Sequence, residues 1–84
     1  MEIYIKFAPR DYERLRNLIP AASPAREAID NATRVDHALE GVLFEGYTVP
    51  CNGDQARAIR EIAQQNCPEL IPTIEQAIDL ARLR

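Results

Sequence analysis

The sequence predicts a small α+β domain with about four helices and a two- to three-stranded antiparallel sheet. Short runs in which apolar and polar residues alternate predict strands, because successive strand side chains face opposite sides of a sheet. Longer stretches carry apolar residues three and four positions apart, which is the spacing of one helix face. Together these patterns give the order strand, helix, helix, strand or hairpin, helix, helix.

The first predicted strand spans residues 1–7, where Ile3, Ile5 and Phe7 alternate with side chains suited to solvent. Pro9 ends this strand and suits the first turn of a helix, because it has no backbone N–H to donate. The helix should run over about residues 9–19. Its predicted buried stripe consists of Tyr12, Leu15, Leu18 and Ile19.

A second helix should begin at Pro24, capped by Ser23, and continue to about residue 33. Its narrow buried stripe consists of Ala25, Ala28, Ile29 and Ala32. The spacing of Val35, Ala38 and Leu39 favours continuation of this helix after a kink or short break near residues 33–36. Gly41 would then suit the position just after the helix end.

Residues 42–44 and 47–51 have strand character and are separated by Glu45-Gly46. Two interpretations are open: a tight hairpin at Glu45-Gly46, or one long strand with a bulge at Gly46. Pro50 cannot donate a ladder hydrogen bond, so this end of the strand should lie at a sheet edge or point its nitrogen outward.

The capping pattern of Asn52 and Gln55 predicts a third helix over about residues 53–65. Its buried residues should be Ala56, Ile59, Ile62 and Ala63. A proline four residues inside a helix costs roughly 3 kcal/mol, so a tight turn over residues 68–71 should precede the last helix, about residues 72–83. The buried residues of that helix should be Ile71, Ile74, Ile78 and Ala81, with Leu70 close by.

The two halves of the chain share this order of elements. Residues 3, 5 and 7 fall on residues 47, 49 and 51 at an offset of 44, and Ser23-Pro24 falls on Cys67-Pro68 at the same offset. We therefore predict a βαα–βαα pseudo-repeat, with units of about residues 2–33 and 42–83, inside a single domain that covers residues 1–84.

Composition limits the classes of function. The net charge of −3 disfavours nucleic acid as a partner, because phosphate binding usually needs a basic excess. The chain has no apolar tract of about 18 residues and no signal-peptide layout, so we expect no membrane contact and a cytoplasmic location. A chain of 84 residues buries a thin core, which favours a protein partner or a homodimer.

Few residues suggest chemistry. Cys51 and Cys67 are expected to be small buried residues, and His37 a solvent-exposed one. A thiol–imidazole pair of Cys51 and His37 would lack an orienting third residue. We therefore expect no enzymatic activity, no metal site and no cofactor; an enzyme or redox protein would require an exposed, reactive thiol.

The first unit resembles ribbon-helix-helix proteins in its strand of residues 2–7, its Pro9, the segment 12–15, and Ser23-Pro24 leading to Ala28-Ile29. In that family a strand and two helices form an obligate dimer whose two-stranded ribbon enters the DNA major groove. The resemblance implies that the two units of this chain pair strand against strand as a single-chain pseudo-dimer. It also implies that the outward strand residues read bases: Glu2, Tyr4 and Lys6, with Gly46, Thr48 and Pro50 in the second unit.

We expect a small non-enzymatic module for protein–protein interaction or regulation. Tyrosine is enriched at interfaces, and the predicted partner-binding residues are Tyr4, Lys6, Tyr12 and Tyr47. The alternative is a ribbon-helix-helix-like transcriptional regulator that contacts DNA through Tyr4, Lys6 and Thr48. Of its outward strand residues, Lys6 has the best reach for base edges.

Overall fold

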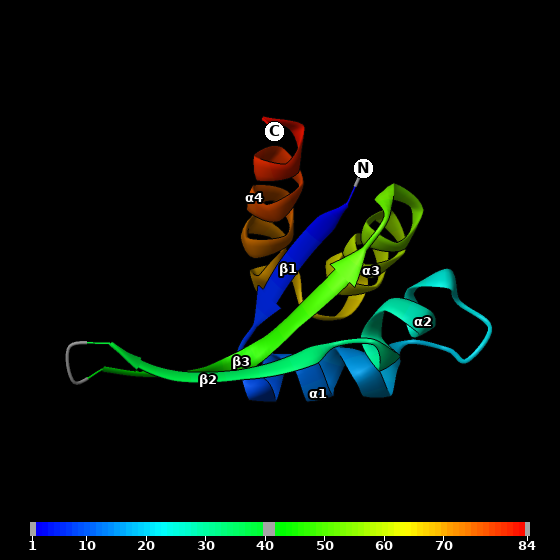
Figure 1. Cartoon of the computed structure of the whole chain (residues 1–84). Helices are drawn as coiled ribbons and strands as arrows, with labels where there is room; N and C mark the ends of the chain where they lie inside the picture. Colours follow the sequence, from blue (N-terminus) through cyan, green and yellow to red (C-terminus); the bar gives the residue numbers. More distant parts are fainter. Residues whose placement is uncertain (1, 40–41, 84) are drawn as a thin grey trace.

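The computed structural model describes residues 2–39 and 42–83 of the chain. These residues form four α-helices and a three-stranded antiparallel sheet with the strand order β1-β3-β2, which confirms the predicted α+β class (Figure 1). The elements are β1 (Ile3–Phe7), α1 (Pro9–Leu18), α2 (Pro24–Asp30), β2 (Thr33–Leu39), β3 (Val42–Cys51), α3 (Gly53–Asn66), the short 3-10 helix η1 (Pro68–Leu70) and α4 (Ile71–Arg82).

The long strand β3 is the centre of the sheet. It pairs with β1 from Ile3↔Cys51 to Phe7↔Tyr47, and with β2 from Thr33↔Thr48 to Leu39↔Val42. Both registers run without a skipped residue, so Glu45 and Gly46 lie inside a continuous strand. The hairpin interpretation is wrong, and the single long strand is right but has no bulge at Gly46.

Gly46 is required by a close backbone approach. A Cβ atom built at this position would lie 2.6 Å from the carbonyl oxygen of Phe7, the last residue of β1. Real Cβ atoms essentially never approach a backbone oxygen so closely. The glycine therefore lets β3 pass the point where the chain leaves β1 for α1 (Figure 1).

The predicted continuation of the second helix is wrong. Helix α2 ends at Asp30, and the segment from Thr33 to Leu39 is strand β2. The spacing of Val35, Ala38 and Leu39 fits a helix, but a partner strand further along the chain satisfies the backbone groups of this segment instead. The proposed helix end at Gly41 lies outside the described residues.

Pro50 occupies the kind of position that the sequence requires. Thr33, the first residue of β2, pairs with Thr48, so Pro50 lies beyond the part of β3 that pairs with β2. At that point β3 has β1 on one side, where Tyr4 is the residue opposite Pro50. A proline nitrogen that faces away from β1 there costs no ladder hydrogen bond.

One hydrophobic cluster joins the sheet to the helices. The sheet contributes Ile3, Ile5, Phe7, Val49 and Cys51, and the predicted buried residues of α2, α3 and α4 are buried or partly buried within the same cluster. In α1 the prediction fails at Leu18, which is 40% exposed. Each helical residue turns by about 100°, so Leu18 lies well off the face formed by Tyr12, Leu15 and Ile19.

The two predicted helix caps, at Ser23 and at Asn52, are confirmed. The Ser23 hydroxyl oxygen accepts a hydrogen bond from the backbone N–H of Ala25 at 3.2 Å. The Asn52 side chain accepts from the N–H of Gln55 at 2.8 Å, and the Gln55 side chain accepts from the N–H of Asn52 at 2.9 Å. Both caps satisfy donors that a helix start leaves without intrahelical partners.

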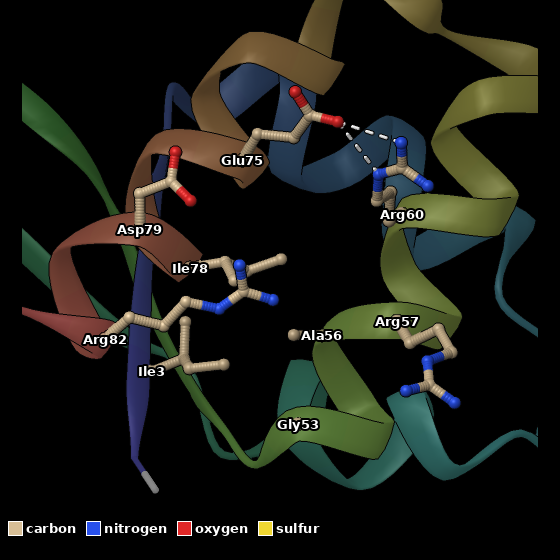
Figure 2. A pocket seen from close by; sticks show the side chains of 9 residues that line it. All are labelled: Ile3, Gly53, Ala56, Arg57, Arg60, Glu75, Ile78, Asp79 and Arg82. Carbon is tan, nitrogen blue, oxygen red and sulfur yellow. Dashed lines mark hydrogen bonds and ion pairs between the residues drawn. The ribbon is translucent and has the colours of Figure 1, made fainter.

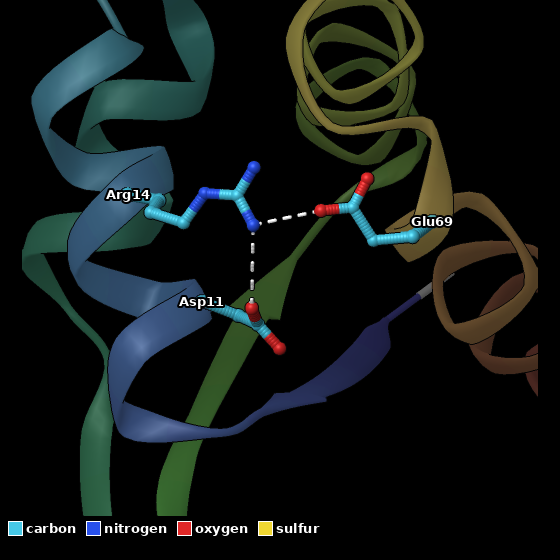
Figure 3. Close-up of polar contacts among 3 residues, drawn as sticks. All are labelled: Asp11, Arg14 and Glu69. Carbon is cyan, nitrogen blue, oxygen red and sulfur yellow. Dashed lines mark hydrogen bonds and ion pairs between the residues drawn. The ribbon is translucent and has the colours of Figure 1, made fainter.

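Exposed ion pairs connect elements that are far apart in the sequence. The Arg14 guanidinium of α1 donates to the Glu69 carboxylate of η1 at 2.7 Å and lies 3.8 Å from Asp11 (Figure 3). In the same way Arg60 of α3 reaches Glu75 of α4 at 2.8 Å. Solvent screens such pairs, so they orient the helices more than they stabilise them.

Candidate functional site

The sheet has one packed face and one open face. Side chains alternate along each strand, so the residues of β1 and β3 between the buried ones share the second face. The register then defines this open face as Tyr4, Lys6, Thr33, Val35, Gly46, Thr48 and Pro50. Tyr4 is 43% exposed and Val35 is 37% exposed, so the open face carries apolar side chains in contact with solvent.

Helix α4 runs along the outer edge of β1 and extends the open face (Figure 1). A shallow hollow of 320 Å³ lies between them, lined by Tyr4, Lys6, Ala77 and Leu80 among others. Leu80 is 54% exposed. Two large apolar side chains, one from the sheet and one from α4, therefore border the same hollow.

Strands β2 and β3 form an arm that projects past α1 (Figure 1). In the described sheet β2 is an edge strand, with β3 as its neighbour on one side. Edge strands carry backbone donors and acceptors that another chain can pair with. The expectation that His37 is exposed lies outside the described side chains.

Tyr12 and Tyr47 lie on the packed side of the molecule. Tyr12 is 8% exposed, and its hydroxyl donates to the buried carbonyl oxygen of Ile29 at 2.8 Å. Its ring stacks on Tyr47 with centroids 3.9 Å apart, and the Arg34 guanidinium lies 5.6 Å from the Tyr47 centroid. Of the four predicted partner-binding residues, the structure thus brings Tyr4 and Lys6 together on the open face and uses Tyr12 and Tyr47 for internal contacts.

The three residues predicted to contact DNA do lie together. Lys6 pairs with Thr48 in the β1–β3 register, and Tyr4 is two residues from Lys6 on the same face. Lys6 is the one basic residue among the seven of the open face, and the exposed Glu2 lies just before β1. The face is therefore close to neutral, not basic.

Sequence reasoning missed Leu80 and Val35. Leu80 could have been found, because it lies on α4 outside the predicted buried stripe and is therefore an apolar residue on a polar side. Val35 could not have been found from the sequence, because its segment was expected to be helical. Its exposure follows from the register with β3, in which it lies opposite Gly46.

Both thiols are buried, as predicted. Cys51 and Cys67 are free, and their exposed fractions are 4% and 0%. Burial raises the pKa of Cys51 to about 11, so this thiol stays protonated near neutral pH. Within residues 2–39 and 42–83 no three histidine, cysteine or acidic side chains gather in a group that could hold a metal ion.

Helices α1 to α4, as far as the structure describes them, lack the length and apolar content needed to cross a bilayer. Comparison of the chain with protein-family models, with curated proteins and with solved structures found no match in any of the three.

Proposed function

We propose that this chain is a small non-enzymatic interaction module that binds another protein through the open face and the adjoining side of α4. The observation that carries the proposal is the pair of half-exposed apolar side chains, Tyr4 and Leu80, at one hollow on the side away from the core. A few well-packed, desolvated side chains, with tyrosine prominent among them, supply most of the binding energy of protein interfaces.

The surroundings of the pair fit this role. Glu2, Lys6, Thr73 and Gln76 line the same hollow, so polar groups surround the apolar centre. An apolar centre with a polar rim is the usual anatomy of a protein interface. Both thiols are buried, so neither is the exposed, reactive thiol that an enzyme or redox protein would require.

The test is capture of a stoichiometric protein from the source lysate with the tagged chain, after nuclease treatment, followed by calorimetry with the protein identified. Leu80→Glu should weaken the binding at least tenfold, because loss of a desolvated anchor costs about 2 kcal/mol or more. The matched control is Leu18→Glu, since Leu18 is 40% exposed but lies on α1. Equal loss with both variants, or no partner at all, would reject the open face as the binding site.

A second copy of the chain is also a partner that this surface could bind. Sedimentation of the wild type and of Leu80→Glu over a range of concentrations distinguishes the two cases. Self-association that Leu80→Glu abolishes and Leu18→Glu preserves would identify the partner as the chain itself.

We infer a ribbon-helix-helix-like DNA-binding regulator as the second candidate, because the β1–β3 register favours it. Ile5 pairs with Val49, and these two residues are equivalent at the repeat offset of 44. The strands of the proposed units thus meet around a common centre. In addition, α4 packs on β1 and α2 packs on β3, so each unit's second helix covers the strand of the other unit.

Duplex DNA binding tests this candidate directly. Fluorescence anisotropy at 50 and 200 mM salt should show an affinity that falls steeply with salt if phosphates are contacted. Lys6→Ala and Tyr4→Ala should then weaken binding, whereas Arg10→Ala on α1 should not. An affinity that is absent, or that does not change with salt, removes DNA from consideration and leaves the protein partner.

A further inference from the structure

A groove between α3 and α4 lies apart from the open face. It has a volume of 530 Å³, within the range of roughly 300–1,000 Å³ that small-molecule sites occupy. Ile3, Ala56 and Ile78 line it, but Ile3 and Ala56 are each 1% exposed, so the accessible apolar surface comes from the half-buried Ile78. Ile3 belongs to the packed face of the sheet, so this groove opens on the helix side of β1 and does not involve the Tyr4–Leu80 hollow.

Three arginines border the groove, and among the residues that the structure describes only Arg60 of these three has an ion-pair partner. Arg60 donates through Nε and Nη2 to one carboxylate oxygen of Glu75, at 3.2 and 2.8 Å. Arg57 on α3 and Arg82 on α4 form no side-chain hydrogen bond or ion pair with the other described residues. Within the groove, the Arg82 guanidinium thus remains available to a ligand.

Figure 2 shows how these groups are arranged. Arg82 extends from α4 over Ile3 and Ile78 toward Ala56, so its guanidinium lies within the groove. Arg57 lies on the side of α3 away from Arg82, and Asp79 projects from the same helix as Arg82 with no ion pair between them. The groove lining therefore carries three arginines and two carboxylates, a formal charge of +1, in a chain whose net charge is −3.

This combination selects a particular ligand chemistry. A guanidinium fork binds oxyanions such as carboxylates and phosphates through two parallel hydrogen bonds. The accessible side chain of Ile78 beside it would remove part of a short hydrocarbon body from water. We propose that the α3–α4 groove binds a small organic anion, with its head on Arg82 and its apolar body on Ile78.

The experiment uses four probes against the full chain, with backbone amide shifts followed by NMR. Hexanoate and phenyl phosphate carry the two kinds of anionic head on an apolar body, hexanol has the body alone, and inorganic phosphate has the head alone. Hexanoate, phenyl phosphate or both should give saturable shifts at Gly53, Ala56 and Ile78, with affinities in the millimolar range or tighter. The stronger of the two identifies the head group.

Arg82→Gln should weaken the better probe roughly tenfold, because it removes charge-assisted hydrogen bonds. Arg82→Lys keeps the charge but loses the guanidinium fork, so its affinity for the probe should lie between those of the wild type and Arg82→Gln. The control is Arg10→Gln, because Arg10 is exposed on α1 and does not line the groove.

Three results would overturn the proposal: no saturable shift with either anion, equal shifts with hexanol, or an unchanged affinity of Arg82→Gln. Leu80→Glu should leave the probe affinity unchanged. The ligand site in the groove can therefore be rejected without affecting the proposed protein-binding role of the open face. The open face can likewise be rejected without affecting the groove.

Discussion

Single residues in this chain have roles that depend on one specific neighbour. At Gly46 that neighbour is the Phe7 carbonyl oxygen, and at Tyr12 it is the Ile29 carbonyl oxygen. Both contacts cross between elements that are distant in sequence. Substitution at either position should therefore show a cost that local propensity does not predict.

Gly46→Ala should destabilise the fold by about 1–3 kcal/mol, because the new methyl group would collide with a backbone oxygen that cannot move alone. Urea denaturation gives the change in the free energy of unfolding. Gly53→Ala is the matched control, since a Cβ there meets nothing within 4 Å. A cost at Gly53 as large as that at Gly46 would show that close approach is not the reason for glycine in β3.

Tyr12→Phe should lower the free energy of unfolding by roughly 1–2 kcal/mol, because the buried carbonyl oxygen of Ile29 loses its donor. Tyr47→Phe should cost less, about 0.5 kcal/mol, because the hydrogen bond from Arg34 to its hydroxyl is exposed and 3.3 Å long. Thermal or urea unfolding of both variants makes the comparison. Equal losses of unfolding free energy for Tyr12→Phe and Tyr47→Phe would show that the buried hydrogen bond to Ile29 stabilises the fold no more than the exposed one.

At the scale of elements, the helices were predictable and one strand was not. Each helix carries its own signals, such as the Asn52–Gln55 capping box and the stripe of Ile59 and Ala63, and these act within one or two turns. Strand β2 has no such local signal, because its identity depends on pairing with β3. The open face follows from that pairing, so Tyr4 and Lys6 could be predicted as surface residues but Val35 could not be placed beside them.

Asn52→Ala tests the strongest of these local signals. The substitution removes the hydrogen bond from the Gln55 N–H to the Asn52 side chain, one of the reciprocal pair. The free energy of unfolding should therefore fall by about 1 kcal/mol. Asn17→Ala, on the exposed side of α1, is the control and should change stability by less than about 0.5 kcal/mol. Circular dichroism during urea unfolding measures both. A neutral Asn52→Ala would mean that tertiary contacts alone hold the start of α3.

At the scale of the whole molecule, the two thiols report on global opening. Cys51 and Cys67 contribute to the single hydrophobic cluster, so reagents should reach them when that cluster opens. Iodoacetamide at pH 8 should modify neither thiol quickly in the native protein and both in denaturant. Rapid native modification of Cys51 would contradict its burial, and the raised pKa with it.

The raised pKa of Cys51 also sets a direction for stability against pH. The unfolded thiol titrates near 9.0 and the folded one near 11, so between these values the unfolded chain releases a proton that the folded chain keeps. The free energy of unfolding should therefore fall as pH rises from about 9 to 11. Cys51→Ala should reduce this fall, and the difference between the two proteins isolates the thiol from other groups that titrate in the range. Identical slopes would show that Cys51 does not contribute.

The position of β1 has a consequence for synthesis on the ribosome. The first strand to emerge is β1, but its neighbour in the sheet is β3, and its outer edge is covered by α4, the last helix in the chain. The apolar side chains of Ile3, Ile5 and Phe7 therefore remain exposed until β3 and α4 have left the exit tunnel. Folding of β1 should therefore come late relative to its own synthesis, and its apolar residues are where a chaperone would bind in the meantime.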